Sequence, residues 1–144
     1  MISTQSSQSI QSFTEKEYNI LSQKIIQCCM EVHKELGPGL MESVYEVCVE
    51  SLMNKAGLYV QRQVLLPVTF KGEKLEKEFI IDMIVNDLII LEFKSVEVIL
   101  PVHEAQLVTY LKLSDKKLGL LINFNVPLLK EGIRRKINGD LNSV

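Results

Sequence analysis

The fold is decided by the stretch Phe79-Ile80-Ile81-Asp82-Met83-Ile84-Val85, which is followed after a short break by Leu88-Ile89-Ile90-Leu91-Glu92-Phe93-Lys94. Both segments are typical of buried β-strands, yet together they carry two carboxylates and one ammonium group. An isolated carboxylate in such a place loses much of its hydration, so it should be paired, protonated or bound to a metal. Convergence of Asp82, Glu92 and Lys94 would suit a divalent cation with a lysine beside it, an arrangement that can hydrolyse a phosphodiester.

Whether these side chains converge depends on the loop between the strands, Asn86-Asp87-Leu88, which begins with turn-forming residues. Glu92 and Lys94 share one face of their strand because side chains alternate. A three-residue loop places Asp82 opposite Glu92, whereas a two-residue loop places it opposite Leu91 and turns Glu92 to the other face. The spacing leaves both registers open, and it also leaves open a cross-strand ion pair with Lys94 that has no chemical role.

The chain of 144 residues is expected to form one domain. Hydrophobic residues make up 47% of it and charged residues 24%, which is typical of a globular protein. Eight of the first twelve residues are Ser or Gln, so we expect a disordered polar tail at 1–12 and a single domain at 13–144. No apolar stretch is long enough to span a bilayer and a signal-peptide core is lacking, so a cytoplasmic location without membrane contact is expected.

The net charge of −2 provides no bulk attraction to nucleic acid, which argues against a non-specific DNA coat protein. A nuclease is compatible with this charge because a metal site concentrates carboxylates and the ion itself is positive. Two basic groups fit a solvated surface when each is taken alone: Lys71, Lys74 and Lys77, and Lys130, Arg134, Arg135 and Lys136.

The cysteines and histidines show no metal-ligand spacing. Cys28, Cys29 and Cys48 lie in apolar helical contexts, which predicts buried, reduced thiols. His33 is expected to face solvent near the end of a helix.

The hydrophobic patterns predict two helices, three antiparallel strands, a third helix and a fourth strand, in that order. A capping box at Thr14-Glu15-Lys16-Glu17 opens the first helix, and Gly37-Pro38-Gly39 ends it. The later helices are expected at 41–56 and 102–113, and the strands at 59–70, 75–85, 88–95 and 118–124, with a short edge strand at 133–137. This order describes an α/β sandwich around a mixed sheet. It excludes a Rossmann fold, and phosphate-loop and nucleophilic-serine motifs are absent from the sequence.

Polar side chains on two of the predicted helices are further candidates for a site. Glu42 and Tyr45 are three residues apart at the start of the second helix, so they share one face. His103, Gln106 and Tyr110 follow an i, i+3, i+7 pattern on the third helix, where Gln and Tyr offer donors to a phosphate or a water. Helix-start electrostatics, core packing and a polar helix surface also explain these patterns.

Several segments of the chain together resemble a known family. The segment Gly39-Leu40-Met41-Glu42-Ser43-Val44-Tyr45 is similar to the signature of the GxxExxY protein family. The resemblance continues, in the order and spacing of that family, through Gln63-Val64-Leu65-Leu66-Pro67-Val68, Lys71-Gly72, Asp82, Glu92-Phe93-Lys94, Pro101-Val102-His103-Glu104-Ala105-Gln106, Tyr110-Leu111 and Gly119-Leu120-Leu121-Ile122-Asn123-Phe124. The family is assigned to the PD-(D/E)XK nuclease-like superfamily, which implies a restriction-endonuclease-like αβββαβ core with a mixed central sheet flanked by helices. One departure is Ile81, which stands where the superfamily often has proline.

The resemblance implies roles for individual residues. Asp82 and Glu92 would bind Mg²⁺ or Mn²⁺ together with the main-chain carbonyl of Phe93, and Glu42 would be a further ligand or would hold a water. Lys94 would orient the attacking water or stabilise charge on the phosphate. This makes Glu42, Asp82, Glu92 and Lys94 the catalytic candidates, and the substrate-binding candidates are Tyr45, His103, Gln106 and Tyr110.

The function implied by the resemblance is that of a metal-dependent nuclease that hydrolyses phosphodiester bonds of DNA. The first alternative is a catalytically inactive module that keeps the fold and binds nucleic acid or a protein partner. The second is a self-associating structural protein whose buried charges form ion pairs. A homodimer is compatible with the nuclease because paired cuts require two active sites.

Overall fold

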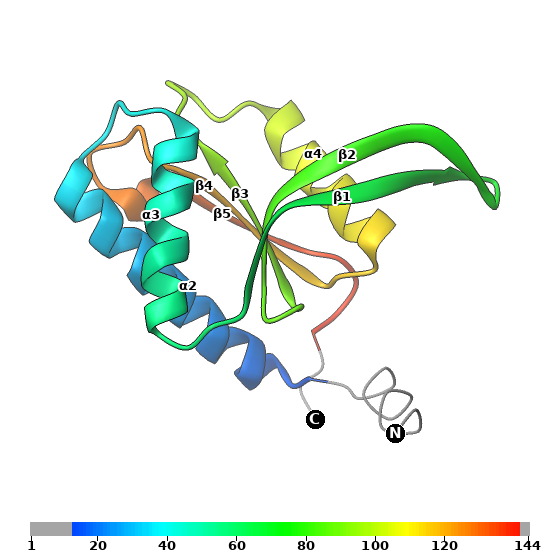
Figure 1. Cartoon of the computed structure of the whole chain (residues 1–144), viewed down its shortest axis with the longest axis horizontal. Helices are drawn as coiled ribbons and strands as arrows, with labels where there is room; N and C mark the ends of the chain where they lie inside the picture. The colour runs from blue at the N-terminus through cyan, green and yellow to red at the C-terminus, as the bar shows by residue number, and fades with distance from the viewer. Residues whose placement is uncertain (1–12, 142–144) are drawn as a thin grey trace.

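A five-stranded mixed sheet forms the centre of the molecule in the computed structural model, which describes residues 13–141 (Figure 1). The strands lie in chain order, and β3 and β4 are parallel while the other neighbouring pairs are antiparallel. The expected tail at 1–12 lies outside the described residues. The elements are α2 (Glu15–Leu36), α3 (Glu42–Lys55), β1 (Val60–Phe70), β2 (Glu73–Val85), β3 (Ile89–Lys94), α4 (Pro101–Ser114), β4 (Leu118–Asn123), a 3-10 turn (Leu129–Gly132) and β5 (Ile133–Ile137).

The element order and the α/β sandwich predicted from the sequence are confirmed, including the short edge strand β5. Helices α2 and α3 cover one face of the sheet and α4 covers the other (Figure 1). Strand β4 is buried along its whole length because it has neighbours on both sides and helices on both faces. Within residues 13–141, no helix is long and apolar enough to cross a membrane.

Helix α2 begins where its capping box predicts. The Thr14 N–H donates to a carboxylate oxygen of Glu17 at 2.8 Å, and the Glu17 N–H donates to the Thr14 hydroxyl at 3.1 Å. The expectation for His33, near the other end of this helix, is wrong. Its ring is buried, and Nε2 lies 2.8 Å from the carbonyl oxygen of Val126, a contact 93 residues away in sequence that helical periodicity cannot reveal.

The loop between β2 and β3 has three residues, because Val85 pairs with Ile89. The antiparallel ladder continues through Met83 and Leu91 and ends there. This is the register that brings Asp82 opposite Glu92.

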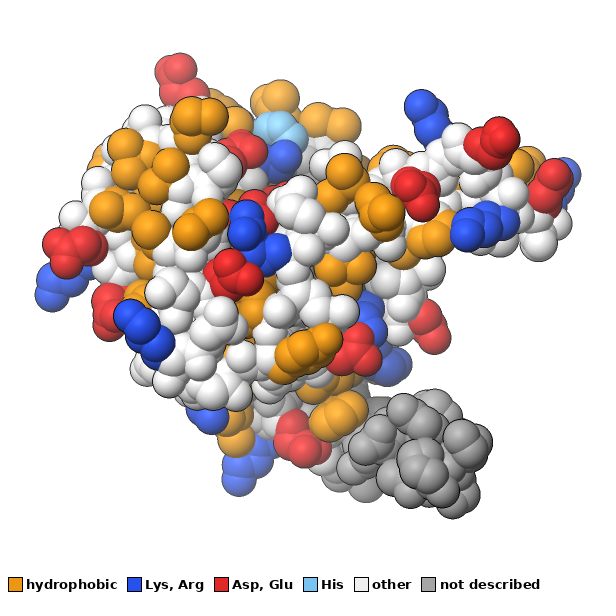
Figure 2. Space-filling view, in the orientation of Figure 1, with side chains coloured by type: hydrophobic (Ala, Val, Ile, Leu, Met, Phe, Trp, Pro, Cys, Tyr) orange, Lys and Arg blue, Asp and Glu red, His pale blue; other side chains and the backbone are white. Residues whose placement is uncertain are grey.

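The β1–β2 hairpin reaches beyond the rest of the molecule (Figure 1). Basic and acidic side chains are interleaved over it (Figure 2), and residues 71–78 are all exposed. The predicted basic group Lys71, Lys74 and Lys77 is therefore mixed with Glu73, Glu76 and Glu78, as expected for a solvated surface.

One residue inside β1 has an unusual backbone conformation. Gln63 has a φ of 52°, in the left-handed region, where a non-glycine residue costs about 1–3 kcal/mol. The ladder pairs Arg62 with Met83 and Val64 with Ile81, but it omits Gln63, which lies between them. The position on β2 that faces this break is that of Asp82.

Candidate active site

Asp82 and Glu92 are in direct contact across β2 and β3. The Asp82 N–H donates to Oε2 of Glu92 at 2.9 Å, and the Phe93 N–H donates to Oδ2 of Asp82 at 2.9 Å. The main-chain pairing of β2 with β3 ends one residue earlier, and beyond it the two carboxylates make the hydrogen bonds between these strands. Within the described part of the chain, Oδ1 of Asp82 and Oε1 of Glu92 accept no hydrogen bond and so remain available to a ligand.

Burial makes both carboxyl groups hard to ionise. Desolvation, followed by the charge of Asp82, raises the pKa of Glu92 to about 8. Desolvation also raises the pKa of Asp82 to about 6, with a smaller contribution from the charge of Glu46. Lys94 opposes both shifts. Two neighbouring acids that are costly to ionise are typical of a functional site rather than of a structural ion pair.

Phe93 and Lys94 complete this part of the site. The Lys94 carbonyl accepts from the Phe124 N–H at 2.8 Å on the β4 side, so the main chain of Phe93 faces β2, where Asp82 lies. The Lys94 side chain is half-buried and acts electrostatically on both carboxylates. Among the residues that the structure describes, its ammonium forms no ion pair within 4.0 Å.

The reverse face of β3 is held by stacked aromatic rings. The Phe93 ring lies 5.9 Å from that of Phe124, and the Phe124 ring stacks on Tyr45 at 4.3 Å. The Tyr45 hydroxyl donates to the Gly37 carbonyl at 2.6 Å and accepts from the Leu40 N–H at 3.1 Å. Tyr45 is fully buried and both of these bonds are internal, so the geometry favours a packing role; its substrate role remains a prediction.

Glu42 lies at the end of β3 rather than between the two carboxylates. Its Oε2 accepts from the Ser95 N–H at 3.2 Å, which joins the start of α3 to the chain directly after Lys94. Its charge contributes, as a minor cause, to the raised pKa of Asp82. Glu42 therefore flanks the site, at a position compatible with holding a water.

The three candidates on α4 have different surroundings. Tyr110 is buried, its ring lies 5.4 Å from that of Phe79, and desolvation together with the charges of Glu92 and Asp82 raises its pKa to about 12. Gln106 is exposed one turn earlier. His103 has a local contact, because its Nδ1 accepts from the Leu100 N–H at 3.0 Å and so caps the start of α4. Tyr110 is thus the α4 candidate whose pKa responds to the charges of Asp82 and Glu92.

Glu46 is a fourth carboxylate near the site that the sequence analysis did not single out. It is buried, it accepts from Nε of Arg62 at 3.0 Å and from Nε2 of Gln63 at 2.8 Å, and its charge contributes to the raised pKa of both Asp82 and Glu92. The signal for it was its spacing, because Glu46 follows Glu42 by four residues and lies on the same helical face.

The donor set suits a small, hard cation. Within residues 13–141, no three His, Cys, Asp or Glu side chains are arranged to hold a metal ion. The available donors are two carboxylates and the Phe93 carbonyl. Mg²⁺ is usually held by one or two carboxylates and keeps several waters, so these donors fit it and the similar Mn²⁺.

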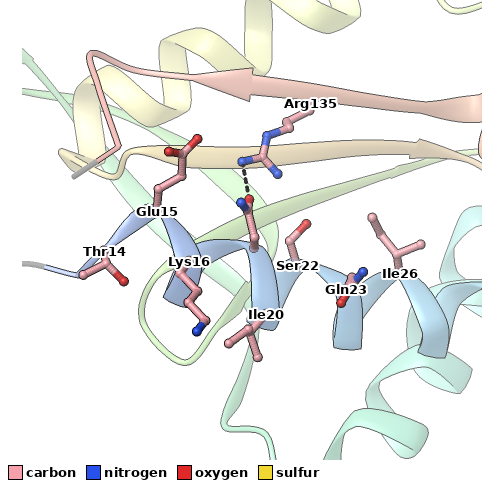
Figure 3. Close-up of a pocket in the computed structure, with 9 residues that line it drawn as sticks. Thr14, Glu15, Lys16, Ile20, Ser22, Gln23, Ile26 and Arg135 are labelled. Atoms are coloured by element: carbon pink, nitrogen blue, oxygen red, sulfur yellow. Dashed lines mark hydrogen bonds between the residues drawn. The ribbon is translucent and has the colours of Figure 1, made fainter. Parts of the chain in front are cut away.

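A cavity of about 810 Å³ lies elsewhere, between the first half of α2 and β5 (Figure 3). Nη2 of Arg135 donates to Oδ1 of Asn19 at 2.9 Å across it. None of the predicted site residues lines this cavity.

Comparison with known families agrees with the fold. A family model described as the PD-(D/E)XK nuclease superfamily matches residues 19–136. The chain belongs to this superfamily, and its sheet and flanking helices form a restriction-endonuclease-like fold. Searches of curated proteins and of solved structures found no match.

The raised pKa of Glu92 predicts a pH dependence of stability. The Glu92 carboxyl group binds its proton more tightly in the folded chain than in the unfolded chain. The free energy of unfolding therefore falls as the pH rises from the ordinary pKa of 4.5 towards the raised pKa of about 8. We therefore expect the metal-free protein to lose stability over this range, and Glu92→Gln to reduce the slope and to be the more stable protein at about pH 8.

Urea unfolding in EDTA at about pH 5 and about pH 8 measures this effect. Glu97→Gln, which removes the same charge at an exposed position, is the control and should retain the parent slope. Equal slopes for the parent and Glu92→Gln would contradict the expectation.

Proposed function

We propose that this protein is a metal-dependent nuclease that hydrolyses phosphodiester bonds, with DNA as its substrate. The observation that carries the proposal is the contact of Asp82 with Glu92 and with the Phe93 main chain, beside Lys94. Membership of the PD-(D/E)XK nuclease superfamily supports the same chemistry.

Asp82, Glu92 and the Phe93 carbonyl would hold the Mg²⁺ or Mn²⁺ ion. When bound, the ion supplies a Lewis acid for the phosphoryl oxygen and lowers the pKa of a water. Both carboxyl groups, whose ionisation burial disfavours, would be ionised when they hold the ion.

The other candidates act on water and on the substrate. The Lys94 ammonium orients the attacking water or stabilises charge that develops on the phosphate. Glu42 holds a water from the start of α3, while Gln106 and Tyr110 position the substrate from α4. Tyr45 and His103 contribute indirectly, by holding the Gly37 turn and the start of α4 in place.

The alternative is a module that binds nucleic acid or a protein partner without cleaving it. The cytoplasmic location and the homodimer remain predictions from the sequence.

Incubation of the purified chain with linear, circular and single-stranded DNA and with RNA tests the proposal, in Mg²⁺, Mn²⁺ or EDTA. We expect cleavage of DNA that EDTA abolishes. Binding without cleavage, weakening as salt concentration rises, would establish the alternative. Cleavage in EDTA would overturn the metal-dependent mechanism.

A further inference from the structure

The backbone of Gln63 differs from that of every other left-handed residue in the described part of the chain. Four non-glycine residues with positive φ lie in turns or at a helix end, where this conformation is ordinary: Lys71, Asn86, Asp87 and Asp115. Gln63 has its φ of 52° inside a strand. Strained backbone of this kind persists only where its surroundings hold it.

The strained residue lies beside the site. Since Arg62 pairs with Met83 and Val64 with Ile81, Gln63 occupies the β1 position that faces Asp82. On its other side, Asp82 contacts Glu92 and Phe93 through side-chain hydrogen bonds, both at 2.9 Å. The regular ladder is thus interrupted on both sides of the same carboxylate.

A buried carboxylate on α3 holds the strained residue in place. Oε1 of Glu46 accepts from Nε2 of Gln63 at 2.8 Å and from Nε of Arg62 at 3.0 Å. Arg62 also contacts Glu50 at 3.4 Å, one turn further along the helix. This clamp, made by Glu46, Arg62 and Gln63, fixes β1 to α3 at the break in the ladder.

We propose that Gln63 is a positioning residue, and that its left-handed conformation, held by Glu46, keeps Asp82 out of the β1–β2 ladder and turned towards β3. With an ordinary strand residue at this position, β1 and β2 pair regularly through Asp82. The hydrogen bonds that join Asp82 to Glu92 and Phe93 then weaken. The consequence for metal binding rests on the nuclease function proposed above, whereas the consequence for these hydrogen bonds does not.

Amide hydrogen exchange of the full chain in EDTA tests the positioning directly. In Gln63→Val, whose β-branched side chain disfavours positive φ, we expect the Asp82 and Phe93 amides to exchange at least about tenfold faster. The Phe124 amide, bonded to Lys94, serves as reference and should keep its parent rate. Gln63→Gly tolerates positive φ but loses the bond to Glu46, so its exchange rates should lie between those of the parent and Gln63→Val.

Gln63→Ala repeats the test without a β-branched side chain if the valine variant fails to fold. If the Asp82 and Phe93 amides exchanged at the parent rate in whichever of these variants folds, the proposal would be overturned. Gln63 would then be a kink that only protects the edge of the sheet. Equal acceleration in Gln63→Gly and Gln63→Val would also overturn it, since the left-handed backbone would then have no role.

Calorimetry with Mn²⁺ extends the test to the proposed function. We expect Gln63→Val to bind Mn²⁺ about 10–100-fold more weakly than the parent, and Gln63→Gly, which lacks the bond to Glu46, to have an affinity between the two. If the parent binds no Mn²⁺ while the two amides still respond, the nuclease proposal fails and the positioning proposal holds. If the parent and Gln63→Val bind Mn²⁺ equally and the amides do not respond, the positioning proposal fails alone.

Discussion

Replacement of Lys94 by alanine is expected to lower the rate of DNA cleavage by at least about a hundredfold, because the ammonium beside the two carboxylates is lost. The fold should remain intact, since the Lys94 side chain is half-buried and its main chain keeps the bond to Phe124. Initial cleavage rates and circular dichroism of the parent and the variant measure the two effects.

The matched control is Lys24→Ala, which removes the same charge from an exposed position on α2. It should cleave at the parent rate. If Lys94→Ala cleaved as fast as this control, Lys94 would have no part in the chemistry. Lys94→Arg keeps the charge but changes its shape and reach, so a partial rate is expected from it.

Replacement of Asp82 by asparagine is expected to weaken Mn²⁺ binding by about a hundredfold or more, because a neutral amide replaces an anionic ligand. The variant should be at least as stable as the parent at neutral pH. Its amide oxygen can still accept from the Phe93 N–H, and the repulsion that raises the pKa of Glu92 is removed.

Asp87→Asn is the matched control for metal binding. Asp87 lies in the β2–β3 loop, is largely exposed and pairs with Lys116 at 3.0 Å. Calorimetry should give the parent affinity for this variant. Equal affinities for Asp82→Asn and Asp87→Asn would remove Asp82 from the proposed metal site.

The element pattern could be predicted because each element carries its own signal. These signals are local features of the sequence: the capping box at the start of α2, the turn at Gly37, and the alternation and apolar runs of the strands. The superfamily expected from the resemblance is confirmed by the family model that spans residues 19–136.

The register that brings Asp82 to Glu92 could not be decided locally. The loop is held by contacts with distant parts of the chain: the Asn86 N–H donates to the Tyr59 carbonyl at 2.7 Å, and Oδ1 of Asn86 accepts from the Tyr59 N–H at 2.8 Å. Asp87 pairs with Lys116, beyond α4. Because these contacts join residues about 27 or more positions apart, spacing alone left two registers open.

The contribution of Gln63 and Glu46 to the site could not be predicted from the sequence, for related reasons. A left-handed backbone leaves no trace in composition when the residue is neither Gly nor Asn. The spacing of Glu46 from Glu42 places both on one helical face, but it does not distinguish a site residue from a solvated surface, because the partners of Glu46 lie on β1.

In β3, the residue that packs against the stacked rings is a different one from the residues proposed to act in the site. The Phe93 ring packs on Phe124, which in turn stacks on Tyr45. Glu92 and Lys94, on either side of Phe93 in the sequence, point to the opposite face of the strand. The peptide that bears Glu92 and Lys94 is thereby held by packing on the side of β3 that faces away from the proposed metal site. A change in the residues around the Glu92 carboxylate is therefore expected to leave the packing that holds this strand in place.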